Sequence, residues 1–250
     1  YSRYTSLNFH KKWSYFSFLP KIIHFFNFKN SKIKRIQRFL TAISEKSLPI
    51  RNALLLTMES KYSNPNSYLS NYWGKKINHI DPFIAYKNIY DLYPNSVDEK
   101  QALFYTDSQI ILKDTFLEKV DKSTMANSIE VRVPFLDKEL TEFALSLPAE
   151  MKVKKGIKKY LLKKSLENLV PDKILYGKKM GFGEPYGYWL NTGLKKYFLN
   201  QIGTDLAKKY FDHETILKNF KEHNLGFGNH DFMLWKVLIF SVWINKNKTY

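Results

Sequence analysis

The densest polar stretch of this 250-residue sequence runs from Lys119 to Asp137 and contains the residue types that charge chemistry needs. Within it, Glu130 and Arg132 flank a valine, and the Val-Pro-Phe-Leu residues that follow predict an extended backbone. Side chains two residues apart on an extended backbone point to the same side. The spacing therefore brings a carboxylate beside a guanidinium, and this pair suits either a structural ion pair or the polar wall of an active site.

A second candidate is the run Tyr176–Pro185, in which Lys178 and Lys179 lie among three glycines. A glycine-rich loop of this kind delivers a mobile ammonium group to a phosphate or to a developing oxyanion. The same composition is also typical of an ordinary surface turn. The residues alone leave both interpretations open.

Several common catalytic patterns are absent from the sequence. It has no Gly-x-x-x-x-Gly-Lys-Ser/Thr loop, no Gly-x-Gly-x-x-Gly loop and no Gly-x-Ser-x-Gly elbow. The six histidines are not spaced as paired metal ligands on a helix, and there is no cysteine. We therefore expect no metal site, no disulfide and no cysteine nucleophile within this chain.

The chain is strongly basic, with 40 Lys and Arg against 23 Asp and Glu and a formal net charge of +17. One cluster of lysines, over 152–164, falls on a predicted helix, whose repeat would scatter the charges around its polar side. We therefore expect a solvated basic surface rather than a nucleic-acid partner, although a bound polyphosphate is compatible with it. The most apolar segment, 234–244, is 11 residues long. Because a bilayer span takes roughly 20 apolar residues, we expect no membrane partner.

Hydrophobic spacing and cap residues predict a chain that is mainly α. Ser96-x-x-Glu99 has the form of a capping box, and Asp114 and Asp137 are placed to cap the two helices that follow. Strand signals are few. We expect 62–93 to form loops with short helical turns. The expected helices cover 11–19, 21–28, 31–46, 50–60, 96–105, a stretch from 114, 137–147, 157–169, 215–222 and 231–244.

Together these stretches resemble the C-terminal synthetase domain of glutamine-hydrolysing asparagine synthetases. The most specific block is Glu-x-Arg-x-Pro-Phe-Leu-Asp, which this chain contains over 130–137. The resemblance covers roughly 96–244. Its other matching residues are Asp114, Leu117, Lys119, Asp121, Lys122, Met125, Ala126, Leu147, Pro148, Lys159, Pro171, Lys179, Gly181, Phe182, Pro185, Trp189, His223, Gly226, Leu234, Trp235 and Trp243.

The resemblance implies a ligase that uses ATP and Mg²⁺. The substrate carboxylate becomes an acyl-adenylate with release of pyrophosphate, and ammonia from glutamine then displaces AMP to give the amide. It implies an α/β nucleotide-binding fold of the ATP pyrophosphatase type, of which this chain is the mainly helical C-terminal portion. We expect 1–95 to be a divergent helical segment and 96–250 the core that bears the motifs. The family's ATP loop, the main Mg²⁺ ligands and the glutaminase domain are expected upstream of Tyr1.

Carried over by position, the resemblance makes Lys179 the catalytic lysine that stabilises charge on the adenylate and pyrophosphate. Lys119 then faces the pyrophosphate with Asp121 near it, and Glu130 and Arg132 lie at the edge of the substrate pocket. The usual Arg before the lysine is replaced by Gly177, with Lys178 as a compensating cation. Lys122 likewise replaces an Arg, and an ammonium does not reproduce a bidentate guanidinium contact.

The acceptor that the resemblance implies by default is aspartate. A sugar carboxylate used in surface-polysaccharide synthesis is the main alternative, and intramolecular closure of a β-lactam is a third chemistry. From another class, a non-catalytic basic helical binding module is also compatible with the sequence. We expect a cytoplasmic protein whose isolated chain is inactive. The sequence is compatible with a homodimer but does not decide the oligomeric state.

Overall fold

The structure is a computed structural model that describes residues 36, 39–56, 65–78, 80–93, 98–178, 183–227 and 230–247. The chain divides into two compact units. Of the described residues, unit 1 comprises 42–53, 83–93 and 98–178, and the others belong to unit 2. The predicted positions 11–28, Ser96 and Lys179 lie outside the described residues. As predicted, the described chain is mainly helical, and its only sheet has two strands.

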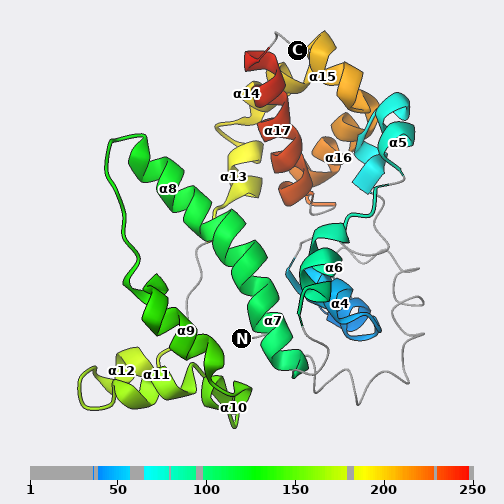
Figure 1. The fold of residues 1–250 in the computed structure, drawn as a ribbon. Helices are drawn as coiled ribbons and strands as arrows, with labels where there is room; N and C mark the ends of the chain where they lie inside the picture. The colour runs from blue at the N-terminus through cyan, green and yellow to red at the C-terminus, as the bar shows by residue number, and fades with distance from the viewer. Residues whose placement is uncertain are drawn as a thin grey trace. The chain divides into compact units, whose positions relative to one another are not determined.

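Unit 1 is built on one unbroken helical run from Glu99 to Met125 (Figure 1). The run contains neither Gly nor Pro, so nothing in the sequence interrupts the helical backbone. Its middle part, η3 (Ser108–Leu117), is a π-helical segment between α7 (Glu99–Asp107) and α8 (Glu118–Met125). The prediction that Asp114 caps a new helix was wrong, because Asp114 lies inside this run.

The N-terminus of the run also differs in detail from the prediction. The side chain of Asp98 caps α7 by accepting a hydrogen bond from the Lys100 backbone N–H at 3.1 Å, and the predicted cap residue Ser96 lies outside the described residues. The predicted cap at Asp137 is confirmed, since its carboxylate accepts from the Leu140 N–H at 3.1 Å. Both caps satisfy N–H groups that have no partner within the helix.

The predicted helix over 157–169 was wrong in its first part. Residues 153–158 form a β-hairpin, in which Val153 pairs with Lys158 and Lys154 with Ile157. The turn residues Lys155 and Gly156 have φ of 48° and 80°. Positive φ at both central residues is the type I′ geometry, which matches the right-handed twist of two-residue hairpins. Only 160–165 is helical before a series of turns leads to Pro171.

Hydrogen bonds of Lys152 attach this hairpin region to the long helical run. Lys152 Nζ donates to Gln101 Oε1 at 2.7 Å, and Gln101 donates to the Leu147 carbonyl at 2.5 Å. Burial lowers the pKa of Lys152. The remaining elements of unit 1 are α4 (Leu48–Leu56, which reaches unit 2 at its end), α6 (Ile84–Asp91), η4 (Pro134–Leu136), α9 (Lys138–Ser146), α10 (Ala149–Lys152), β1 (Val153–Lys154), β2 (Ile157–Lys158), α11 (Tyr160–Ser165) and α12 (Asp172–Leu175).

Unit 2 is a helical cluster around α17 (Asp231–Lys246), whose Leu234, Val237 and Leu238 are buried. The rings of Phe198 and Phe220 stack beside them with centroids 4.7 Å apart. The predicted final helix pair is confirmed. The other elements of unit 2 are η2 (Pro65–Tyr68), α5 (Asn71–Ile77), α13 (Tyr186–Asn191), α14 (Lys195–Ile202), α15 (Asp205–Tyr210) and α16 (His213–Asn224).

Gly226 follows α16 at a position whose backbone conformation favours glycine. Its φ is +72°, a left-handed conformation that side chains disfavour. The Gly226 N–H donates to the His223 carbonyl and the Phe227 N–H to the Glu222 carbonyl, at 3.1 and 2.9 Å. This pair of bonds is the Schellman motif, which turns the chain back towards α17.

Phe198→Ala should lower the free energy of unfolding of unit 2 by about 3–5 kcal/mol, because a fully buried ring is replaced by a cavity. Urea titrations followed by the fluorescence of Trp189 and Trp235 would measure the change. Tyr188→Ala is the matched control, since Tyr188 is 67% exposed. We expect it to change stability by no more than about 0.5 kcal/mol. Equal effects of the two variants would contradict this core.

Candidate functional site

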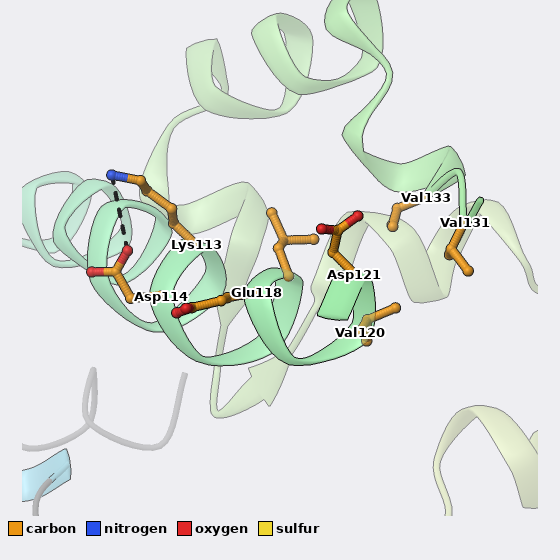
Figure 2. Close-up of a pocket in the computed structure, with 8 residues that line it drawn as sticks. Lys113, Asp114, Glu118, Val120, Asp121, Val131 and Val133 are labelled. Carbon is orange, nitrogen blue, oxygen red and sulfur yellow. Dashed lines mark ion pairs between the residues drawn. The ribbon is translucent and has the colours of Figure 1, made fainter. Parts of the chain in front are cut away.

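The candidate site is a pocket of about 470 Å³ in unit 1, between the long helical run and the segment that follows it. The run contributes one wall through Asp114, Leu117 and Asp121 among others, and Val131 and Val133 contribute the other (Figure 2). Helical spacing explains the first wall, because residues about one and two turns apart share a face. The described residues that line it are Lys113, Asp114, Leu117, Glu118, Val120, Asp121, Val131 and Val133.

The charged part of this lining is acidic. It has three carboxylates, on Asp114, Glu118 and Asp121, against the single ammonium of Lys113. Lys113 Nζ lies 3.9 Å from Asp114 Oδ1, and Lys122 forms an ion pair with Glu118. Asp121 forms no ion pair with any described residue. The pocket therefore presents one unpaired carboxylate beside apolar side chains.

The ion pair between Glu118 and Lys122 changes the titration of both groups. The hydrogen bond and charge of Lys122 lower the pKa of Glu118, and those of Glu118 raise the pKa of Lys122. Both side chains are open to solvent, at 51% and 73% exposed. Solvent screening therefore keeps the contribution of this pair to stability small.

Lys119 and Asp121, the two residues predicted near the pyrophosphate, lie on different faces of the same helix, α8. Asp121 lines the pocket, as described, whereas Lys119 does not. Lys119 is exposed, and its Nζ lies 5.9 Å from the centroid of the Phe116 ring. Residues that are two positions apart on an α-helix face different sides of it. The structure therefore does not bring Lys119 and Asp121 together.

The predicted pair of Glu130 and Arg132 is present. Arg132 Nε lies 2.6 Å from Glu130 Oε1, which agrees with the expectation that both side chains leave the backbone on one side. The two side chains are 66% and 88% exposed, and neither lines the pocket. The alternate residues Val131 and Val133 line it instead. Alternate residues of this extended segment point to opposite sides, which explains why Glu130 and Arg132 pair with each other while Val131 and Val133 line the pocket.

Lys178 is described and exposed, just after α12. The segment that leads to it is anchored, because the Tyr176 hydroxyl donates to Glu167 Oε1 at 2.7 Å. This bond raises the pKa of Tyr176. A Cβ atom at Gly177 would collide with the backbone carbonyl oxygen of Lys173. Glycine at this position therefore has a packing reason in this chain.

Sequence reasoning missed half of the residues that line the pocket. It did not single out Lys113, Glu118, Val131 or Val133, and it assigned Asp114 to a cap. The spacing of Asp114, Glu118 and Asp121 at i, i+4 and i+7 could have shown that the three carboxylates share a face. That signal was hidden because the helix was expected to begin at Asp114 instead of passing through it.

The described residues contain no group of three or more His, Cys, Asp or Glu side chains that could hold a metal ion. Nor does the described part of the chain include a helix long and apolar enough to cross a membrane.

Comparisons with known proteins give consistent matches. The family model described as Asparagine synthase matches residues 7–245. Asparagine synthetase [glutamine-hydrolyzing] 1 of Bacillus subtilis is 34% identical over 179 residues, which are 70% of this chain and 28% of the relative. A putative asparagine synthetase [glutamine-hydrolyzing] of Mycobacterium tuberculosis strain H37Rv is 39% identical over 133 residues, 53% of this chain and 20% of the relative. No solved structure gives a significant match.

Replacing Lys122 by Met should return the pKa of Glu118 upward towards its ordinary value, because the hydrogen bond and the positive charge that lower it are removed. A carboxyl-carbon NMR titration of Glu118 would measure this. Since the pKa of Glu118 is lowered in the folded chain, its contribution to stability is present above the unfolded pKa. It is lost as the pH falls through the folded pKa.

Lys119→Met is the control, since it removes an ammonium of the same helix that does not pair with Glu118. If the pKa of Glu118 did not change in Lys122→Met, or if it rose equally in Lys119→Met, the ion pair between Glu118 and Lys122 would be refuted.

Proposed function

The chain belongs to the asparagine synthase family, and we propose that it forms the C-terminal part of a synthetase that amidates aspartate with ATP and ammonia from glutamine. The observation that carries the proposal is the family match over residues 7–245. The sequence block Glu130–Asp137, which is specific to the family resemblance, contributes Val131 and Val133 to the wall of the pocket.

The chain spans about a quarter of the length of the curated relatives that it matches, 28% and 20% for the two described above. The activity, substrates and partners of a complete enzyme are therefore proposals for this chain. They include a glutaminase domain in the same protein, a cytoplasmic location and an inactive isolated chain. The proposed arrangement has 1–95 as a divergent segment and 96–250 as the core that bears the motifs.

In the proposed reaction, the β-carboxylate of aspartate attacks the α-phosphorus of ATP, which gives an acyl-adenylate and pyrophosphate. Ammonia then attacks the acyl carbon, and AMP leaves as asparagine forms. We assign Lys179 to stabilising the negative charge that accumulates on the phosphates in the first step. Lys178 and Lys119 supply further positive charge on the pyrophosphate side.

The described residues do not form a nucleotide site on their own. The described residues that line the pocket include three carboxylates, two of them in ion pairs, and no unpaired cation, so the pocket is poorly suited to a triphosphate. They also include no metal-binding cluster. We therefore propose that the main ligands of ATP and Mg²⁺ lie outside the described residues. The unpaired carboxylate of Asp121 is suited to a cationic group, and the ammonium group of aspartate is one.

Lys179→Ala in a full-length protein that contains this chain should abolish glutamine-dependent formation of AMP and pyrophosphate. Loss of one electrostatic stabiliser of a transition state typically costs about 10²–10³ in rate. Glutaminase activity should persist, because it does not require the synthetase lysine. Coupled assays of pyrophosphate and of glutamate would measure the two activities separately.

The matched control is Lys173→Ala, which removes a nearby exposed lysine of α12. We expect it to retain pyrophosphate release. Unchanged pyrophosphate release in Lys179→Ala would overturn the role of Lys179, and the absence of aspartate-dependent release in the unmodified protein would overturn the proposed substrate.

A further inference from the structure

The most concentrated positive charge of unit 1 lies between Met151 and Ser165. This stretch contains seven lysines and no Asp or Glu. A helix over the whole stretch would spread these charges around its circumference, which was one of the grounds for expecting a merely solvated surface. The structure forms a hairpin over 153–158 and a helix only over 160–165, so Lys154, Lys155 and Lys158 are not spread around a helix.

Three of these lysines, Lys154, Lys155 and Lys158, belong to the short hairpin itself. Val153 is buried against Ala149 and Phe104, which fixes the base of the hairpin to the rest of unit 1. From Lys154 to Lys159 every residue is exposed. The two-residue turn at Lys155 and Gly156 holds the strands close together, and α11 begins directly after Lys159.

Most of these lysines are not neutralised by neighbouring carboxylates. Lys164 pairs with Glu167 at 2.8 Å, but within the described parts of the chain Lys154, Lys155, Lys159 and Lys163 form no ion pair. The ammonium groups of Lys154 and Lys163 lie over the rings of Tyr160 and Tyr176, at 5.0 and 4.9 Å from their centroids. These ring contacts orient the two lysines without cancelling their charge.

We propose that the hairpin 153–158 and the start of α11 bind the phosphodiester backbone of double-stranded nucleic acid without regard to sequence. A two-stranded ribbon is one of the elements that the major groove of DNA admits. Lysines supply the backbone affinity by neutralising phosphates and releasing counterions. A bilayer surface fits less well, because interfacial binding uses the broad apolar face of an amphipathic helix. In the six-residue helix α11, Tyr160 and Leu161 are half-buried within unit 1.

The test compares two triple charge reversals in the full chain. The first, K154E/K155E/K159E, reverses three exposed lysines of the hairpin region that lack ion pairs. The second, K195E/K196E/K208E, makes the same change of net charge on exposed lysines of α14 and α15 in unit 2. Fluorescence anisotropy of a labelled DNA duplex, measured over a series of salt concentrations, gives affinity and salt slope. Circular dichroism checks that each variant is folded.

We expect the hairpin variant to bind the duplex at least about tenfold more weakly than the parent chain. We also expect its salt slope to be smaller by about one for each phosphate that the variant no longer neutralises. The unit 2 control should change affinity by about twofold or less. K154Q/K155Q/K159Q should show a weaker loss in the same direction, and it keeps the test valid if the triple Glu variant does not fold.

Equal losses of affinity in the hairpin variant and the control would overturn the proposal, because they would show that only the overall charge matters. The absence of duplex binding by the parent chain would overturn it as well. The third overturning outcome is hairpin-dependent binding to vesicles that contain phosphatidylserine without hairpin-dependent binding to the duplex. None of these measurements requires catalytic turnover, so they are independent of the proposed synthetase activity.

Discussion

The unbroken helical run from Glu99 to Met125 is the constraint on which the rest of unit 1 depends. Its N-terminal half holds α10 and the hairpin through Lys152–Gln101 and through the ion pair of Lys100 with Glu150 at 3.2 Å. Its C-terminal half carries the carboxylates that line the pocket. Because both halves belong to one rigid element, the position of the pocket relative to the hairpin follows from continuity of the backbone. A proline within the run would kink or break the helix and so disturb this connection.

The segment after the run shows how one backbone geometry serves two purposes. Extended residues alternate in direction, so Val131 and Val133 line the pocket while Glu130 and Arg132 pair in solvent on the other side. An exposed ion pair adds little to stability.

Local sequence signals predicted those features whose cause is local. The Asp137 cap and the two last helices were correct, because capping and hydrophobic periodicity act within a few residues. The hairpin at 153–158 was missed, since its residues also fit a helical pattern and what stabilises the strand is burial of Val153 against Ala149 and Phe104. Asp114 was misassigned for a related reason. A residue can cap a helix only where the backbone before it is not already helical, and the backbone before Asp114 is helical.

By itself the sequence determined the mainly helical character, the family and the residue types available for chemistry, because these depend on composition, periodicity and motif order. The tertiary structure decided which of those residues meet. It placed Asp121 in the pocket and left Lys119 outside it, and it placed Lys154, Lys155 and Lys158 on a hairpin. Burial and the direction of the backbone decide which residues lie close together. Both depend on contacts between segments that are far apart in the sequence, and local sequence patterns do not reveal these contacts.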